Sequence, residues 1–300
     1  MHQAVLLEKV IQFLDPKPGE NFIDCTLGEA GHTKAILEKT KPRGRVLGID
    51  VDSDSLKRIQ SQERLILVHG NFKDLRKIIQ ENHFDPVNGI LFDLGLSSWQ
   101  IEESGKGFTF KKDEPLKMIL NSRQEVTAEE VLNTWPEESL IEIFKKYGEE
   151  KYSRRIVTAI VNHRKLSPIK TTFQLKEIID KTIPFSKTRR GKSNRVLARI
   201  FQALRIVVND ELENLKQGLN QAIKVVVPKG IIVVISFHSL EDRLVKHFFK
   251  NKEKRGQLKI LTKKPIIANE TELNVNPRAR SAKLRAAMKL KGSKELSLEP

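Results

Sequence analysis

Between residues 20 and 95, short apolar runs alternate regularly with stretches of helical pattern. The expected strands are Asn21–Cys25, Arg45–Ile49, Leu65–His69 and Gly89–Phe92. The helices expected after the first three strands are Thr33–Lys39, Ser53–Gln60 and Leu75–Asn82. Strands that alternate with helices at this spacing form a parallel, doubly wound sheet. The alternation therefore predicts an α/β fold for this part of the chain.

Polar residues stand at or just beyond the ends of these strands: Asp24, Asp50, Asn71 and Asp93. In an open parallel sheet, ligands bind outside the carboxyl ends of the strands. We therefore expect these four residues to border a ligand site.

After residue 100 the alternation stops, and residues 127–182 have helical periodicity instead. A long helix over about Ile200–Val226 is expected to follow, and then a strand over Gly230–Ser236. The simplest account is a helical insertion within an α/β domain. The expected bounds are residues 1–104 and 196–300 for the discontinuous α/β domain and 105–195 for the insertion.

The loop Asp24–His32 follows the first strand, with glycines only at Gly28 and Gly31. A dinucleotide site needs G-x-G-x-x-G so that the backbone can approach a pyrophosphate, and this pattern is absent. Glu29 would place a negative charge beside phosphate, which disfavours a nucleotide-dependent oxidoreductase. S-adenosylmethionine carries a sulfonium cation and no phosphate, so an acidic loop suits it better. Asp50 is placed to accept hydrogen bonds from ribose hydroxyls, although an ordinary turn with surface acids is the alternative.

Asp93 and Ser97 follow the fourth strand, where the reacting end of a cofactor would lie. Methyl transfer to nitrogen depends mainly on alignment, and a nearby oxygen can hold the hydrogen of the acceptor amine and ease its loss. Methylation of a pyrimidine carbon-5 would need a cysteine nucleophile, and Cys25 stands at the first strand instead. His32 has no second histidine or cysteine at ligand spacing, so no metal is expected.

The formal net charge of +16 is unevenly distributed along the chain. Residues 243–291 contain fifteen Lys and Arg against three Asp and Glu, and Lys187–Arg205 contains seven basic residues and no acid. Two such blocks favour a polyanionic partner, because phosphate neutralisation releases counterions. An anionic membrane surface is the competing partner, but neither block shows a clear amphipathic helix with aromatic anchors.

Targeting signals are not evident. No run approaches the roughly 20 apolar residues that span a bilayer, and Met1–Asp15 lacks the pattern of a signal peptide. The single cysteine excludes an internal disulfide and a multi-cysteine zinc cluster. These features favour a cytoplasmic location, or an organelle matrix if the source is eukaryotic. The oligomeric state stays open, a homodimer included.

Segments spread over nearly the whole chain resemble the bacterial small-subunit (16S) rRNA cytosine-N4 methyltransferases. The most diagnostic are Ser236–Arg243, with the sequence SFHSLEDR, and Asn276–Arg285, with the sequence NPRARSAKLR. The other matching segments are His2–Val10, Asp24–His32, Gly48–Asp52, Asp93–Gln100, Tyr147–Glu150 and Phe201–Leu212. Segments of this length are far more specific than any single loop motif.

The resemblance implies a Rossmann-like, S-adenosylmethionine-dependent methyltransferase domain with an inserted helical domain. It implies N4-methylation of a decoding-centre cytosine in 16S rRNA within the assembled small subunit. The cofactor-binding residues of that family match Ala30, Gly31, His32, Asp50, Phe72, Asp93 and Gln100. Asp93 and Ser97 are the expected catalytic groups. The expected RNA contacts are Arg199, Arg205, His238, Arg243, Arg278, Arg280, Lys283 and Arg285.

The chain departs from the family pattern on the expected substrate side. Ala30 replaces a glycine, Lys106 an arginine, Lys117 an aspartate, Ile119 an arginine and Arg195 a histidine. Lysine lacks the bidentate fork of arginine, and the changes at 117 and 119 remove an acid and a base together. These changes motivate a second hypothesis from another class: a small-subunit assembly factor that keeps the fold but has weak or no methyl transfer.

Overall fold

The structure, a computed structural model, describes residues 4–122, 124–183 and 189–291, and only the backbone at 189–192. The chain divides into two compact units. The sheet unit comprises Met1–Gly95 and Leu212–Pro300, and the helical unit comprises Leu96–Glu211. The insertion predicted at residues 105–195 stays a prediction. Ile200 and Leu204, beyond its predicted end, are buried in the core of the helical unit.

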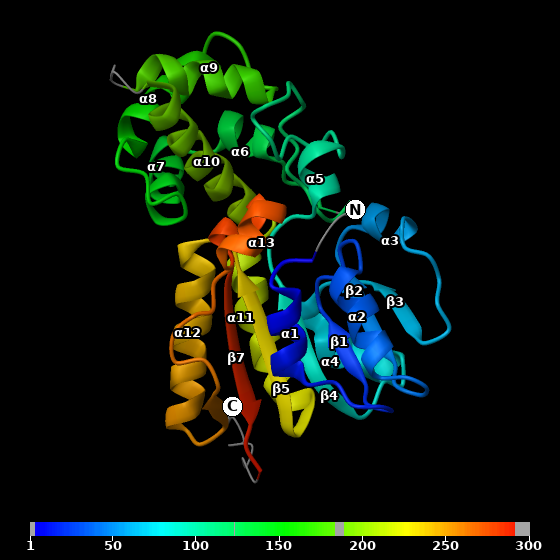
Figure 1. The fold of residues 1–300 in the computed structure, drawn as a ribbon. Coiled ribbons are helices and arrows are strands. Elements are labelled where there is room, and N and C mark those ends of the chain that lie inside the picture. Colours follow the sequence, from blue (N-terminus) through cyan, green and yellow to red (C-terminus); the bar gives the residue numbers. More distant parts are fainter. Residues whose placement is uncertain (1–3, 123, 184–188, 292–300) are drawn as a thin grey trace. The chain divides into compact units, whose positions relative to one another are not determined.

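The sheet unit is built on seven strands in the order β3-β2-β1-β4-β5-β7-β6 (Figure 1). They are β1 (Phe22–Asp24), β2 (Val46–Asp50), β3 (Leu65–His69), β4 (Val87–Asp93), β5 (Val226–Ser236), β6 (Leu258–Ile260) and β7 (Lys283–Lys289). The first five strands are parallel, and β7 runs antiparallel to β5 and β6. This confirms the predicted Rossmann-like α/β fold. The order reverses between β1 and β4, which is the switch point where such sheets bind ligands.

Helices cover both faces of the sheet because successive strand residues point to opposite sides. The helices of this unit are α1 (Leu7–Leu14), α2 (Gly31–Lys39), α3 (Ser53–Lys57), α4 (Leu75–Glu81), α11 (Glu211–Val225), α12 (Ser239–Lys254) and α13 (Glu270–Val275), with 3-10 turns η1 (Phe72–Asp74) and η2 (Pro277–Ser281). Ile23 and Ile90 share a core with residues of α4, α11 and α12. Phe22 and Leu91 share the opposite core with residues of α1 and α2.

The helical unit has a core of its own. Its helices are α5 (Ser98–Glu102), α6 (Ala128–Thr134), α7 (Glu137–Lys146), α8 (Ser153–Arg164), α9 (Thr172–Thr182) and α10 (Arg189–Val208). Leu140 and Phe144 of α7, Ile156 of α8 and Ile179 of α9 are fully buried together with Leu116 from the preceding loop. Within the described residues, no helix is both long and apolar enough to cross a membrane.

The expected helix over Ile200–Val226 is two helices in the structure. Asp210 adopts a left-handed conformation with φ 49°, which ends α10 before α11 begins. The carboxamide of Asn209 donates to the carbonyl of Met118 at 2.8 Å and accepts from the N–H of Leu120 at 2.9 Å. The side chain of Asn209 thus ties the end of α10 to the loop before α6.

Candidate functional site

Three aspartates are the last residues of neighbouring parallel strands. Asp50 ends β2, Asp24 ends β1 and Asp93 ends β4. Because these strands lie side by side and run the same way, the three carboxylates gather at one edge of the sheet, beside the switch point. Asn71 follows β3 and accepts from the N–H of Lys73, so it caps η1.

Asp24 is almost fully buried and holds the following loop. Its carboxylate accepts from the Thr33 hydroxyl at 2.8 Å and from the Thr26 N–H at 3.2 Å. The Thr26 hydroxyl in turn accepts from the N–H of Asp93 at 2.7 Å. Asp24 is therefore connected through Thr26 to the backbone of Asp93. Sequence reasoning placed Asp24 at a strand end but missed both threonine contacts.

Asp50 connects the end of β2 to the loop that follows β1. Its carboxylate accepts from the Gly28 N–H and from the Asp52 N–H, both at 2.9 Å. Gly28 has φ 50°, a left-handed conformation that suits glycine. Each carboxylate oxygen can accept a further hydrogen bond, so Asp50 remains able to receive a ribose hydroxyl.

The backbone is sterically constrained at Ala30 and Gly31, where α2 begins. Ala30, at the N-cap of α2, has φ 59°, and its methyl group is buried. A left-handed conformation costs an L-residue roughly 1–2 kcal/mol, which glycine avoids. A Cβ atom added at Gly31 would lie 2.9 Å from the Cβ of Ala4, so this position requires glycine.

His32 lies in the first turn of α2 and is buried. Its Nε2 is 2.9 Å from the carbonyl oxygen of Val5, and its Nδ1 is 3.4 Å from Oδ2 of Asp93. The side chain therefore joins the segment before α1 to the end of β4. The other oxygen of Asp93, Oδ1, is buried without a hydrogen-bond partner among the described residues.

Burial raises the pKa of all three strand-end aspartates. The pKa of Asp24 and of Asp50 rises to about 6, although hydrogen bonds from Thr33 to Asp24 and from backbone N–H groups to both oppose the rise. Burial raises the pKa of Asp93 to about 7; His32 opposes this, while Asp24 and Glu241 add to it. The carboxylates thus lack sufficient positive charge around them. A cationic ligand at this edge would stabilise their ionised forms.

Phe72 follows β3 in η1 and is half-buried. Its ring meets that of Phe92 edge-on, with the centroids 5.4 Å apart. A Cβ added at Gly218 of α11 would lie 2.6 Å from the Phe72 ring, so α11 leaves room for the ring only because residue 218 is glycine. Sequence reasoning found Phe72 by resemblance and missed Gly218.

Ser97 and Gln100 form a reciprocal capping box at the start of α5. The Ser97 hydroxyl accepts from the Gln100 N–H at 3.2 Å, and the Gln100 side chain accepts from the Ser97 N–H at 2.9 Å. Both residues belong to the helical unit. Their predicted roles in catalysis and cofactor binding stay predictions.

Several predicted RNA contacts are engaged within their own units. Arg285 is 6% exposed and donates to Asp242 at 2.6 Å, and Lys283 is 3.6 Å from the same carboxylate. Arg285 therefore links β7 to α12, and its predicted contact with RNA stays a prediction. Arg205 contacts Glu211 through two hydrogen bonds. Arg199 is half exposed and bonds to the buried Glu150 at 3.2 Å.

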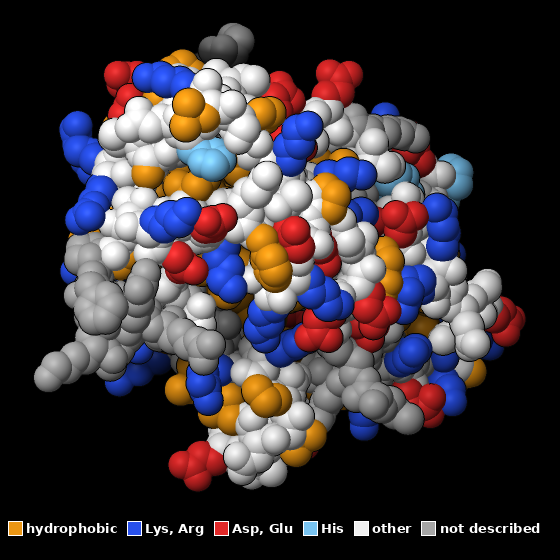
Figure 2. Space-filling model, turned by 90° about the horizontal axis from the view of Figure 1, so that it is seen from above, with side chains coloured by type: hydrophobic (Ala, Val, Ile, Leu, Met, Phe, Trp, Pro, Cys, Tyr) orange, Lys and Arg blue, Asp and Glu red, His pale blue; other side chains and the backbone are white. Residues whose placement is uncertain are grey.

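The remaining predicted contacts lie nearer the surface. Arg243 and Arg280 are exposed, and Arg278 is partly exposed. His238 caps α12 by accepting from the Glu241 N–H at 3.3 Å, which gives it a local structural role. Figure 2 shows acidic side chains interspersed among the basic ones on the face it presents.

Two parts of the sequence patterns lie outside the described residues. These are His2 in the first matching segment and, in the second basic block, Lys187 and the side chains of Arg189, Arg190 and Lys192.

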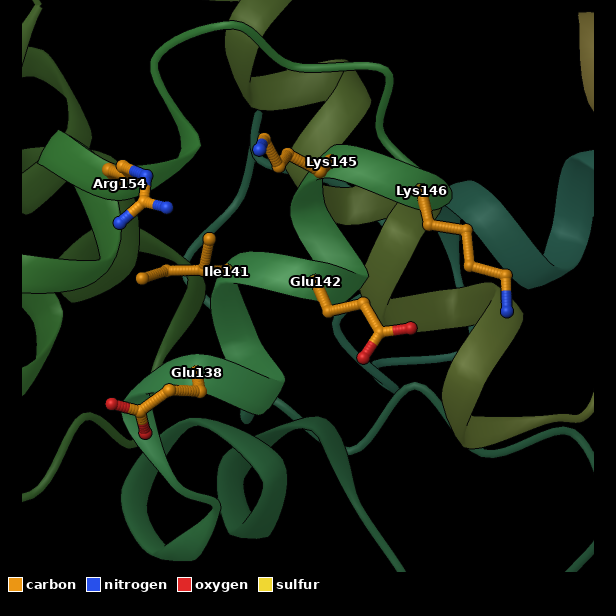
Figure 3. A pocket seen from close by; sticks show the side chains of 6 residues that line it. All are labelled: Glu138, Ile141, Glu142, Lys145, Lys146 and Arg154. Carbon is orange, nitrogen blue, oxygen red and sulfur yellow. The ribbon is translucent and has the colours of Figure 1, made fainter.

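An open pocket lies on the surface of the helical unit (Figure 3). Its lining comes from Arg154 of α8 and from five residues of α7: Glu138, Ile141, Glu142, Lys145 and Lys146. The pocket contains none of the predicted site residues. Its mixed charges favour neither a phosphate nor a cation, so the strand-end edge of the sheet unit is the better candidate.

Comparison with known proteins matches residues 1–290 to the model of the MraW methylase family. The protein named ribosomal RNA small subunit methyltransferase H of Carboxydothermus hydrogenoformans is 44% identical, over 96% of this chain and 98% of that protein. The protein of the same name from Clostridium botulinum strain Loch Maree is 42% identical, over 96% and 99%. A solved rRNA methylase from Streptococcus thermophilus aligns over 97% of this chain and 99% of that one, with 10% identity and a TM-score of 0.42.

Proposed function

Because the chain belongs to the MraW methylase family, we propose that it methylates small-subunit ribosomal RNA with S-adenosylmethionine as the methyl donor. The finer proposal is transfer to N4 of a decoding-centre cytosine in 16S rRNA. The relatives named above are small-subunit rRNA methyltransferases and align with nearly all of this chain.

The observation that carries the donor assignment is the set of three carboxylates with raised pKa values at the strand ends. These groups are stabilised by a cation and repel a pyrophosphate. S-adenosylmethionine offers a sulfonium cation and no phosphate. When bound, it supplies a methyl group that a nucleophilic nitrogen can take. A nicotinamide dinucleotide would instead bring two negative phosphates beside Asp24 and Asp50.

We assign the roles from the geometry of the sheet unit. Asp50 accepts the ribose hydroxyls with the lone pairs that Gly28 and Asp52 leave free. The turn at Ala30–His32 brings backbone close to the ligand, and Phe72 packs against the adenine. Gln100 completes the cofactor set on the strength of the resemblance.

Asp93 is the proposed acceptor of the proton that the amino group of the base loses. Its buried Oδ1 has no partner among the described residues and can accept a hydrogen bond from the amino group of the base. Bound S-adenosylmethionine would supply the methyl group to the amino nitrogen, and the electron pair of the carbon–sulfur bond would stay on sulfur. The nitrogen then loses one proton to the Asp93 carboxylate. Ser97 is the second oxygen proposed to hold the acceptor.

The RNA partner is proposed from the basic surface of the chain. Arg243 and Arg280 of the sheet unit and Arg199 of the helical unit are exposed, and Arg278 is partly exposed, which suits contact with phosphate oxygens. Such contacts set the position of the RNA without reading its sequence. Base choice then depends on the groups that surround the reacting amine.

The decisive experiment incubates the protein with isotopically labelled S-adenosylmethionine and small subunits from cells that lack this gene. Mass spectrometry of nucleosides should find label in N4-methylcytidine, and the Asp93→Asn variant should reduce the rate at least about 100-fold. The variant should still bind subunits with unchanged affinity. Subunit binding without transfer by the wild-type protein would instead support the assembly-factor hypothesis, which the strained Ala30 favours.

A second experiment tests the cofactor assignment separately. Asp50→Asn should weaken S-adenosylmethionine binding by roughly 10- to 100-fold, because a hydrogen bond to a charged group contributes about 1.5–3 kcal/mol. Calorimetric titration measures this, with Asp54→Asn as the control, since Asp54 is engaged with Lys57. RNA affinity should be the same in both variants. Equal cofactor affinity in the two variants would contradict the assignment of Asp50.

A further inference from the structure

The hydrogen bond of His32 to Val5 fixes which ring nitrogen carries a proton. Nε2 lies 2.9 Å from the carbonyl oxygen of Val5, deep in the protein. A carbonyl oxygen only accepts hydrogen bonds, so Nε2 must be the donor. In a neutral imidazole only one nitrogen is protonated. Nδ1 of neutral His32 is therefore unprotonated.

Nδ1 faces Oδ2 of Asp93 across 3.4 Å. If the imidazole were neutral and the carboxyl ionised, two unprotonated acceptors would point at each other within a buried site. One proton between Nδ1 and Oδ2 removes this repulsion. The pair then exists either as imidazolium with carboxylate or as imidazole with carboxylic acid, and both forms have zero net charge.

The charged groups around Asp93 favour a proton held at this contact. Asp24 on β1 and Glu241 on α12 both raise the pKa of Asp93, and His32 on α2 is the group that lowers it. Glu241 is itself turned to the backbone, where it accepts from the N–H groups of Phe237 and His238. The Thr26 hydroxyl fixes the backbone of Asp93. Asp93 thus points one oxygen at His32, and its other oxygen has no hydrogen-bond partner among the described residues.

We propose that His32 is a positioning residue that shares one proton with Oδ2 of Asp93, so that Oδ1 remains the acceptor for the proton released by the methylated amine. That the released proton comes from a methylated amine rests on the proposed function. During transfer, the nitrogen–carbon bond forms, the carbon–sulfur bond breaks, and the amine proton moves to Oδ1. The pair then carries two protons and one positive charge, which replaces the sulfonium charge lost in the reaction.

The first test needs no enzymatic turnover. In NMR spectra of the ligand-free protein, Nε2 of His32 should stay protonated across neutral pH. The Asp93 carboxyl carbon should titrate, and the Nδ1 resonance should report a hydrogen bond to the Asp93 carboxyl. An unprotonated Nε2, or an Nδ1 without a hydrogen bond to Asp93, would overturn the proposal. Because this test does not depend on methyl transfer, it separates the proposal from the proposed function.

Two variants then separate proton sharing from a structural role. His32→Gln places an amide near the Nε2 position, which retains the donor to Val5 and removes the group facing Asp93. It should raise the midpoint of the Asp93 titration by about one to two pH units, because a nearby cation commonly lowers a carboxyl pKa by that much. His32→Asn keeps a neutral donor toward Asp93 and should raise it less.

The same order should appear in the pH dependence of kcat on small subunits. The acidic limb of the wild-type profile should shift to higher pH in His32→Gln and by a smaller amount in His32→Asn. A merely structural role predicts lower kcat in both variants without a shift of the limb, and that result would refute the proposal. If the wild-type protein transfers no methyl group, the proposed function fails while the NMR result stands.

Discussion

Asp24, Asp50 and Asp93 place three carboxylates at one edge of the sheet, where burial holds the pKa of each near neutrality. In the ligand-free protein this arrangement is unfavourable, since a buried carboxylate loses hydration on ionising. It becomes favourable when a cation binds. Proton release and cation binding are therefore linked at this site.

The linkage predicts a pH-dependent preference for a charged cofactor. Below about pH 6, Asp24 and Asp50 are protonated and do not attract a sulfonium. As pH rises to 8, Asp24 and Asp50 ionise, so affinity for S-adenosylmethionine should rise. S-adenosylhomocysteine lacks the sulfonium and should gain little. Calorimetry should find that the ratio of the two affinities rises roughly tenfold, equivalent to about one pKa unit of coupling.

The control for this prediction is Asp50→Asn, which removes one of the two groups that titrate near pH 6. Its affinity ratio should vary less with pH than that of the wild-type protein. A ratio that stays constant between pH 6 and 8 in the wild-type protein would show that the sulfonium does not lie near these carboxylates.

Single residues differ in how far the sequence reveals them. The positions of Asp24, Asp50 and Asp93 follow from strand alternation alone, because each ends an apolar run. The contact of His32 with Asp93 does not, because it depends on how the first turn of α2 meets β4. The burial of Arg285 and its ion pair with Asp242 do not follow from the basic segment that contains it, because they depend on how β7 packs against α12.

At the scale of elements, α11 shapes the position of Phe72. Gly218→Ala would place a Cβ 2.6 Å from the ring and 3.3 Å from the carbonyl oxygen of Phe72. The ring must move, so affinity for S-adenosylmethionine should fall about 3- to 30-fold. The free energy of unfolding should change little, because alanine favours the helix by about 1 kcal/mol and offsets the strain.

Fluorescence titration and chemical denaturation measure these two quantities. Gln217→Ala, at the neighbouring position of α11, is the control and should leave cofactor affinity unchanged. A Gly218→Ala variant with wild-type affinity would indicate that Phe72 does not contact the cofactor.

α12 presents a basic face opposite its buried one. Val245 and Phe249 pack into the core, whereas Lys246, Lys250 and Lys254 are exposed at intervals of four residues. Residues four apart share a helix face. The structure gives these three lysines no ion-pair partner among the described residues. A row of unpaired cations of this kind matches the phosphates of an RNA backbone.

Neutralising this face should weaken RNA binding in a salt-dependent way. The triple variant K246Q/K250Q/K254Q should lower the slope of log affinity against log salt by about 2 to 3, since each phosphate contact contributes about 0.7 to 0.9. Filter binding to small-subunit RNA at several salt concentrations measures the slope. Cofactor affinity should not change.

The matched control removes three lysines that already have acidic partners. K41Q/K57Q/K77Q changes the net charge equally, but these residues pair with Glu38, Asp54 and Glu81. Its slope should stay near that of the wild-type protein. Equal slopes in both triple variants would show that only net charge matters and that α12 is not a contact face.

The elements themselves were predictable where hydrophobic pattern and turn signals agree. β3 has the expected bounds, and β1, β2 and β4 differ by only a residue or two. The sequence patterns predicted neither β6 nor β7. In β7, the charged residues Lys283, Arg285 and Lys289 interrupt the apolar pattern that indicates a strand. The break between α10 and α11 was missed because it depends on the left-handed Asp210 and on the contacts of Asn209.

At the scale of the whole molecule, the two units have separate hydrophobic cores. The sheet unit buries its side chains against the two faces of one sheet, and the helical unit packs α6 to α10 around its own interior. The insertion expected at residues 105–195 stays a prediction. A long helix pattern by itself gives no signal of which core the helix joins.

Separate cores predict separate unfolding. Phe144 is fully buried in the helical unit and Phe249 is buried in the sheet unit, so truncation of either to alanine should cost about 3–5 kcal/mol. Hydrogen exchange should show faster exchange in the helical unit of Phe144→Ala and in the sheet unit of Phe249→Ala. S-adenosylmethionine should restore protection in Phe249→Ala far more than in Phe144→Ala, because a ligand stabilises the unit whose folded form it binds. Equal loss of protection across both units in either variant would show that the chain unfolds as one cooperative whole.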